Sequence, residues 1–311
     1  MILAVVAALG LSGAAHAQDV APPDGGSAVV QELEVIARPP GPALWRVRRG
    51  EAEVVILGGL TPLPHSLEWS SPRLDRALKD ARLVLLPPKA SASPLEAARL
   101  LLRYPSLKTK NLRAGLPPEL RARVERTAAS IGKDPKKYDG WKPGVAGFMM
   151  LEDFREQGGL SSAKPGSTLA RRAKAAGVTA RPIEDFKASS LMKAAANLPL
   201  QAHIACLTAA LDEIDHEAAN APPAARAWAR GDLAGVRERA APALLDACLQ
   251  QVPTFGVLLE RGTAEAVSDI EKALAKPGRT IAVIDLQYLL RREGVLDRLK
   301  ARGAVVDLPP E

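Results

Sequence analysis

Aromatic residues, cysteine and histidine are all scarce in this chain of 311 residues. Aromatic side chains make up 4% of the sequence, and there are two cysteines and four histidines. So few aromatics leave no stacking platform for single-stranded nucleic acid, although the net charge is +7. Neither Cys206 nor Cys248 belongs to a Cys-x-x-Cys or Cys/His cluster. We therefore expect no nucleic-acid partner and no cysteine-based metal site.

The common hydrolase motifs are also absent. The sequence has no Gly-x-Ser-x-Gly elbow, no His-Glu-x-x-His and no phosphate-binding glycine loop. His203 and His216 are 13 residues apart, which matches no usual metal spacing. Acidic residues surround His216, and this cluster is either a solvated helix face or a weak metal site.

The first 17 residues are apolar and contain no Lys, Arg, Asp or Glu. They end in Ala15–Ala17, the small-x-small pattern that precedes signal peptidase cleavage. We expect a signal peptide over residues 1–17, cleavage after Ala17, and a periplasmic or secreted protein; an uncleaved membrane anchor is the alternative. Residues 18–41 are rich in proline and glycine, which predicts a disordered tether, and residues 42–311 are long enough for one large domain.

An exported protein with two cysteines most often pairs them. We therefore predict a disulfide between Cys206 and Cys248, both in helical sequence. The alternative is two buried thiols too far apart to react.

The pattern of elements predicts an α/β fold. Residues 44–57 resemble a hairpin, Ser71 and Pro72 start a helix, and residues 82–86 form the next strand, so the order is strand, helix, strand. A second start at Ser93 has Glu96 spaced to complete a capping box. We expect a mixed central sheet with crossover helices and two helical insertions. The second insertion, residues 191–251, should be interrupted at Pro222-Pro223 and again at Pro242.

Two predicted strands end in residues placed for ligand binding. One is Val54–Gly59, which ends in two glycines, and the other is Thr280–Asp285, followed by Tyr288. In open α/β folds, ligand sites lie at such strand ends.

These two segments, with several other landmarks in order, resemble the TraB/GumN family, which includes the Tiki-type proteins. That family carries Gly-x-x-His at both places. All four tryptophans fall at its landmarks, and Trp228–Asp232 resembles its Trp-x-x-Gly-Asp. The further landmarks are Pro42–Val47, Leu67–Trp69, Trp141–Pro143, Ile183-Glu184 and Leu259–Arg261.

The chain departs from the family at the residues that carry chemistry. Thr61 and Tyr288 stand where the family has its two histidines, and Leu86 stands where it has an acidic residue. Gly262 replaces an asparagine and Ser167 an aspartate. These side chains cannot supply the imidazole and carboxylate ligands of a catalytic divalent ion. The family-equivalent pocket therefore consists of Gly58, Thr61, Leu86, Glu184, Arg261 and Tyr288, with no metal ligand, no cofactor and no catalytic residue predicted.

Several roles stay open for these residues. Thr61 and Tyr288 either line a remodelled pocket, or Thr61 caps the turn while Tyr288 fills the vacated space as a structural plug. Glu184 and Arg261 are either a ligand clamp or a structural ion pair. His65, four residues after Thr61, is either an exposed loop residue or a substitute ligand.

The resemblance implies a metal-dependent, peptidase-like activity for Tiki-type members and envelope roles for bacterial ones. Because the ligands are missing here, we expect a non-catalytic member that binds an envelope peptide, lipid or protein. One alternative is a hydrolase with a rebuilt site. The other is a scaffold on an anionic membrane, since residues 73–142 hold 17 Lys+Arg against 7 Asp+Glu, a balance of 17 − 7 = +10. A charge-rich helical segment is more often simply a solvated face, which is the other explanation of this balance.

Overall fold

A computed structural model describes residues 41–90, 93–239 and 253–309. It contains a six-stranded mixed sheet with the strand order β10-β1-β2-β9-β4-β7. The strands are β1 (Leu44–Arg49), β2 (Ala52–Gly59), β4 (Ala81–Leu86), β7 (Ala180–Pro182), β9 (Gly278–Asp285) and β10 (Val305–Asp307). Strands β2, β9, β4 and β7 run parallel, whereas β1 is antiparallel to both β2 and β10. The predicted α/β class with a mixed sheet is confirmed.

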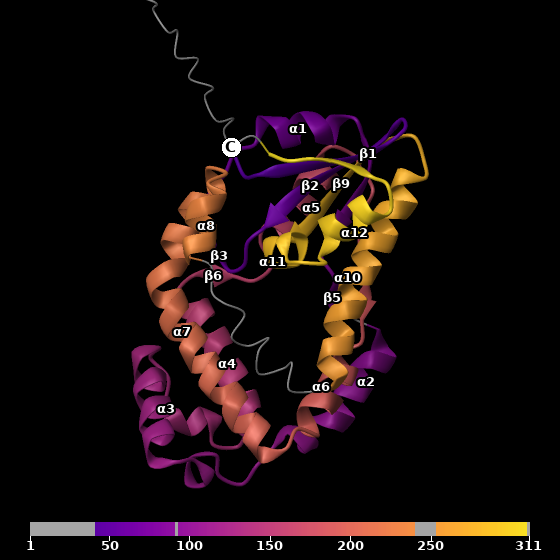
Figure 1. Cartoon of the computed structure of the whole chain (residues 1–311). Coiled ribbons are helices and arrows are strands. Elements are labelled where there is room, and N and C mark those ends of the chain that lie inside the picture. Colours follow the sequence, from indigo (N-terminus) through magenta and orange to yellow (C-terminus); the bar gives the residue numbers. More distant parts are fainter. Residues whose placement is uncertain (1–40, 91–92, 240–252, 310–311) are drawn as a thin grey trace, which may run out of the picture. The chain divides into compact units, whose positions relative to one another are not determined.

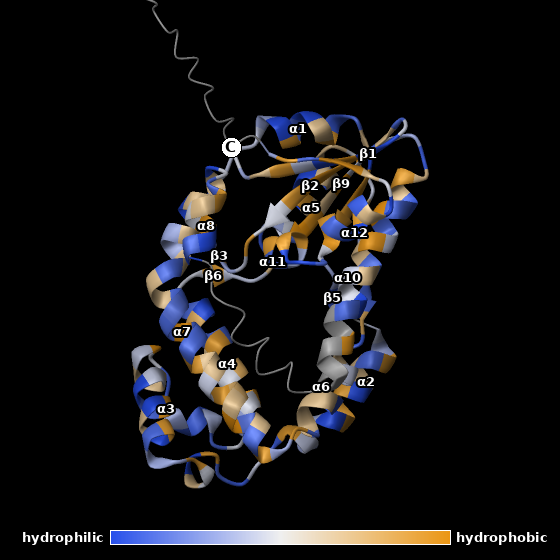
Figure 2. Cartoon of the chain, viewed as in Figure 1, coloured by the Kyte–Doolittle hydropathy of each residue, from blue (hydrophilic) through white to orange (hydrophobic). Residues whose placement is uncertain are grey.

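Strands β2 and β9 form the centre of the sheet. Both are buried along most of their length and are coloured as hydrophobic in Figure 2. Successive side chains of a strand point to opposite faces. Leu44 and Val55 therefore face α1 (Pro72–Lys79), while Trp45 and Gly58 face α11 (Leu286–Leu290) on the other side (Figure 1).

The remaining helices beside the sheet are α5 (Gly166–Ala175), α10 (Pro253–Leu274) and α12 (Val295–Ala301). Two small ladders accompany the main sheet. One pairs β3 (Leu63–Pro64) with β6 (Leu160–Ser161), and the other pairs β5 (Lys89–Ala90) with β8 (Asp185–Phe186).

Two helical insertions follow β5 and β8. The first contains α2 (Pro94–Arg103), η1 (Tyr104–Leu107), η2 (Arg113–Gly115), α3 (Pro118–Ser130), η3 (Pro135–Tyr138) and α4 (Pro143–Gln157). The second contains α6 (Ala188–Ala196), α7 (Leu200–Ala229) and α8 (Leu233–Arg239). The insertions share a core of their own, in which α4 packs along α7 (Figure 1). A Cβ atom on Gly147 would lie 3.0 Å from the Leu207 Cα, so the glycine lets these two helices approach closely.

Helix α7 corrects one prediction from the sequence. It continues through Pro222 and Pro223, where we expected a break. Each proline removes a helical N–H, so the carbonyls of Ala218 and Ala219 lose their donors. Both alanines are exposed, and water can satisfy those carbonyls. The expected break at Pro242 lies outside the described residues.

The capping box at Ser93 forms only in part. The Ser93 hydroxyl accepts from the Glu96 N–H at 3.2 Å, as predicted. The Glu96 carboxylate, however, accepts from the Ser189 N–H in the first turn of α6, at 2.7 Å. That hydrogen bond lowers the pKa of Glu96, whose side chain is buried. The residue therefore joins the two insertions instead of closing its own helix.

The acidic residues around His216 also have a structural role. Glu213 and Glu217 of α7 pair with Arg155 of α4, at 2.9 and 2.5 Å. Asp212 and Asp215 pair with Arg123 of α3, at 2.6 and 2.7 Å. The cluster holds α3 and α4 against α7. The prediction of a solvated face was wrong for Glu213 and Glu217, whose side chains are largely buried, whereas Asp212 and Asp215 remain exposed.

In the described part of the chain, no single helix is both long and apolar enough to cross a membrane. Helices α6 and α7 pass that test of length and composition only together, and they meet at 117°. The predicted signal peptide and the tether up to residue 40 lie outside the described residues.

Candidate functional site

The parallel strands bring the two predicted strand ends together. Gly59 at the end of β2 pairs in register with Asp285 at the end of β9. Leu86 at the end of β4 pairs with Pro182 of β7, and Glu184 follows two residues later. Because these strands run parallel, residues from four distant parts of the sequence meet at one edge of the sheet.

Thr61 and Asp285 form a direct hydrogen bond at this edge. The Thr61 hydroxyl donates to Asp285 Oδ2 at 3.1 Å, and Asp285 Oδ1 accepts from the Gln287 N–H at 2.9 Å. Asp285 therefore caps α11 and holds the exposed Thr61 at the same time. Our sequence interpretation placed Asp285 in a strand but gave it no role. Its position as an acidic residue ending a buried strand was the available signal.

Tyr288 and Leu86 are only partly buried. Both pack against the edge of the sheet core, and the Arg291 guanidinium carbon lies 5.7 Å from the centre of the Tyr288 ring. A side chain that filled the vacated ligand space as a plug would be fully buried. Tyr288 is therefore not fully enclosed, and its role as a pocket wall or as a plug stays a prediction.

Glu184 and Arg261 form an ion pair. Arg261 Nη2 lies 3.1 Å from Glu184 Oε1, and the two side chains are 62% and 18% exposed. This pair links the end of the sheet to α10. Exposed pairs of this kind stabilise a protein by about 0–1 kcal/mol. Of the two roles left open by the sequence, the structure shows the ion pair.

Glu260, an acidic residue of α10, is held more tightly than Glu184. Arg298 of α12 donates to both of its carboxylate oxygens, at 2.5 and 2.9 Å. These bonds lower the pKa of Glu260, so the carboxylate is ionised at neutral pH. Arg291 lies 3.9 Å away and donates to the Thr263 hydroxyl at 2.7 Å.

The residues at this edge do not fit the family's divalent metal. Among the described residues, no group of three or more His, Cys, Asp and Glu side chains is placed to hold a metal ion. His65 is exposed, and its hydrogen bonds are made by its backbone: its N–H donates to Gly159 O at 2.7 Å, and its carbonyl accepts from Lys164. The side chains at this edge therefore support no hydrolytic step through a metal.

Gly58 has a steric role next to this edge. A Cβ atom on it would lie 2.5 Å from Leu286 Cδ2 and 2.5 Å from Trp45 Cζ3. Its carbonyl accepts a hydrogen bond from the Trp228 indole at 2.7 Å. Trp228 in turn packs edge-on against Trp69, with ring centres 5.3 Å apart. Three of the four landmark tryptophans are therefore grouped here: Trp45 lies beside Gly58, Trp228 donates to its carbonyl, and Trp69 packs against Trp228.

The rest of Trp228–Asp232 is also structural. Gly231 has φ +72°, and a Cβ atom there would lie 2.8 Å from the Gly41 carbonyl. The Asp232 carboxylate accepts from the Gly235 N–H at 2.9 Å and so caps α8. This motif shapes the turn between α7 and α8.

Of the two cysteines, Cys206 is buried on α7. Cys248 lies outside the described residues, so the disulfide stays a prediction.

The fold defines an open α/β protein with a strand-end edge whose polar groups bond to one another. The chain belongs to the TraB/PrgY/gumN family, whose model matches residues 43–307. Neither a curated protein nor a solved structure matches it significantly.

Proposed function

We propose that this protein is a non-catalytic member of the TraB/PrgY/gumN family that acts in the cell envelope by binding a partner. The observation that carries the proposal is the bonding at the sheet edge. Thr61 bonds to Asp285, Glu184 to Arg261, and Glu260 to Arg298. Thr61, Glu184 and Arg261 belong to the family-equivalent pocket, and their polar groups here bond within the protein.

The rival hypothesis is a hydrolase rebuilt around Glu184, Arg261, Tyr288 and His65. Such an enzyme needs a nucleophile or water next to a base that is itself oriented by a third group. Glu184 is paired with Arg261, and His65 is an exposed residue with backbone hydrogen bonds. This arrangement favours binding over hydrolysis.

Metal analysis tests the proposal directly. Purified wild-type protein should carry no stoichiometric Mn, Co or Zn, and EDTA should leave its melting temperature unchanged. About one metal per chain, removed by EDTA with loss of stability, would contradict the proposal.

A variant with restored ligands adds a sharper comparison. Thr61→His, Leu86→Glu and Tyr288→His together return the two imidazoles and the carboxylate. We expect this variant to gain metal binding. A control with Tyr288→Phe in place of Tyr288→His should bind more weakly, because it lacks one ligand.

Export is part of this proposal. It rests on the apolar residues 1–17 and the Ala15–Ala17 pattern. Amino-terminal sequencing of protein from the periplasmic or secreted fraction should begin at Gln18. An intact residue 1 in a membrane fraction would instead indicate an uncleaved anchor.

A second candidate function is docking on an anionic membrane through α2. This helix exposes Leu95, Leu101 and Leu102, which are 60%, 75% and 81% exposed. Arg99 and Arg103 lie on the same helix, in the basic segment 73–142. Exposed apolar side chains beside cations are typical of helices that bind anionic lipid surfaces.

Vesicle sedimentation distinguishes this candidate. Wild-type protein should bind vesicles that contain phosphatidylglycerol better than vesicles of phosphatidylcholine alone. Leu101→Ser with Leu102→Ser should reduce the binding, whereas Val305→Ser, at a site that is 56% exposed on β10, should not. Equal binding by both variants would exclude α2 as the docking surface.

A further inference from the structure

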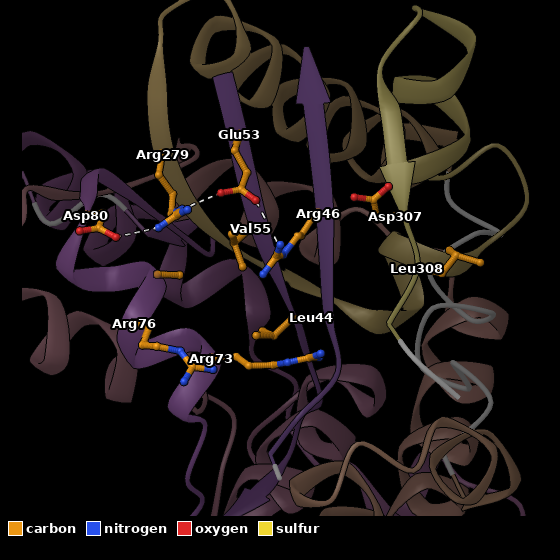
Figure 3. A pocket seen from close by; sticks show the side chains of 11 residues that line it. Leu44, Arg46, Glu53, Val55, Arg73, Arg76, Asp80, Arg279, Asp307 and Leu308 are labelled. Atoms are coloured by element: carbon orange, nitrogen blue, oxygen red, sulfur yellow. Dashed lines mark hydrogen bonds and ion pairs between the residues drawn. The ribbon is translucent and has the colours of Figure 1, made fainter. Parts of the chain in front are cut away.

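A cavity of about 520 Å³ lies between α1 and the sheet, on the face to which Leu44 and Val55 point (Figure 3). Its size is in the range of small-molecule sites, roughly 300–1,000 Å³. None of the residues of the family-equivalent pocket lines it. The cavity is therefore separate from the strand-end edge, and its role does not depend on the proposed function.

Four arginines line this cavity: Arg46, Arg73, Arg76 and Arg279. Arg279 is neutralised, because it pairs with Glu53 at 2.6 Å and with Asp80 at 3.0 Å. Arg46 reaches the same Glu53 only at 3.7 Å. The third acidic residue of the lining, Asp307, pairs with Arg48 at 2.9 Å. The acidic groups of the cavity are thus already engaged.

Arg73 and Arg76 have no such partner. Within the described residues, neither forms a hydrogen bond or an ion pair. They are three residues apart on α1, so their guanidinium groups repel each other along one helix face. No ion pair among the described residues offsets this repulsion. A bound anion would.

The cavity also has an apolar part. Val55 is 3% exposed and Ala77 is 7% exposed, and Leu44 lies between the side chains of Arg46 and Arg73 (Figure 3). A ligand with a charged head and a short apolar group would match this lining. A purely ionic ligand would leave the apolar wall in contact with water.

We propose that this cavity binds a phosphate monoester carried on a small apolar group. Guanidinium groups match the oxygens of a phosphoryl group in pairs. A phosphate monoester carries a charge of about −1.5 to −2 at neutral pH, enough to offset Arg73 and Arg76 together. A carboxylate carries half of that charge and would leave one arginine unbalanced.

Isothermal titration with phenyl phosphate tests the proposal on the full chain at low salt and pH 7.5. Wild-type protein should bind saturably at one site, benzoate at least tenfold more weakly, and phenol not measurably. Arg73→Gln with Arg76→Gln should weaken phenyl phosphate binding at least tenfold. Lys79→Gln is the matched control, because it removes one cation of α1 that does not line the cavity.

The single variant Arg76→Gln should show an intermediate loss of affinity for phenyl phosphate, which provides a test should the double variant misfold. Melting curves verify that each variant is folded. The proposal is overturned if wild-type protein shows no saturable binding. It is also overturned if the arginine variants and Lys79→Gln bind equally.

A competition arm identifies the source of the phosphoryl group. If the natural ligand is a lipid head group, vesicles with phosphatidic acid should bind through Arg73 and Arg76 and be displaced by phenyl phosphate. If it is a free phosphate monoester, soluble phenyl phosphate should bind while phosphatidic acid vesicles do not compete. The site is refuted if phenyl phosphate does not bind and if the variant with Arg73→Gln and Arg76→Gln binds vesicles as well as wild-type protein does.

Discussion

The indole N–H of Trp228 donates a hydrogen bond of 2.7 Å to the carbonyl of Gly58, 170 residues away in sequence. This bond joins the end of α7 to the end of the buried strand β2. Both residues are family landmarks, and both act through packing. Beside the strand-end edge, these two landmarks therefore help to build the scaffold.

Replacing each of the two glycines at the end of β2 by alanine should change the stability of the protein by different amounts. Gly58→Ala places a methyl group 2.5 Å from side-chain atoms of Trp45 and Leu286. Overpacking of this kind typically lowers the free energy of unfolding by about 1–3 kcal/mol. Gly59→Ala is the control, because its Cβ would make ordinary contacts at 3.5 Å and beyond. Urea denaturation of both variants measures the difference. Equal stability would show that Trp45 and Leu286 move aside at little cost.

Tyr288→Ala should destabilise the protein by about 1–3 kcal/mol, less than the 3–5 kcal/mol typical of a fully buried aromatic ring. The reason is that Tyr288 is only partly buried at the sheet edge. In a domain of this size, each kcal/mol shifts the melting temperature by about 2–4 °C. A shift of one degree or less would mean that the ring contributes nothing to the core. A loss above about 4 kcal/mol would support the plug hypothesis.

His203 should make the protein less stable in mild acid. Burial, with a smaller contribution from Lys142, lowers its pKa from 6.5 to about 4. Its Nδ1 accepts from the Gly144 N–H, and its buried Nε2 has no hydrogen-bond partner among the described residues. In the unfolded chain the His203 imidazole therefore takes up a proton near pH 6.5, whereas in the native protein it does so only near pH 4. Stability is fully present above pH 6.5 and falls as the pH falls towards 4.

Urea denaturation at pH 7.5 and pH 5.0 measures this effect. The loss in wild-type protein due to His203 should be about 2 kcal/mol. In His203→Gln the pH dependence over this interval should be smaller by that amount. The buried Glu96 and Asp153 do not interfere, because their pKa values are lowered below 4.5 and 3.8 and act at lower pH. An unchanged pH dependence in the variant would assign the effect to other groups.

Reduction should destabilise the mature protein if Cys206 and Cys248 are bonded. The closed loop of about 40 residues restricts the unfolded chain by roughly 3–4 kcal/mol in the entropy model. Thiol titration of the native, unreduced protein should find no free thiol, and dithiothreitol should lower the melting temperature. The control is Cys206→Ser with Cys248→Ser, whose stability should not respond to reductant. Two titratable thiols in the native protein would refute the bond.

The sequence alone predicted the elements that are specified locally. Ser71 does cap α1 through the Leu74 N–H at 3.3 Å, and the glycine-ended segment 54–59 does lie in a buried strand, β2. Caps, turns and hydrophobic periodicity depend on residues a few positions apart, so they can be recognised without the fold. The missing histidines at Thr61 and Tyr288 were equally visible.

Only the tertiary structure decided which partner each polar side chain takes. Glu96 had the spacing for a capping box but bonds to Ser189, and Asp285 at the end of β9 bonds to Thr61 in the loop after β2. The arginine cavity is lined by residues of α1, β1 and β9, and β9 lies about 200 residues after the other two in the sequence. A carboxylate or guanidinium can bond to any group that packing brings within reach. Its partner is therefore set by which elements pack together, and local sequence carries no record of that choice.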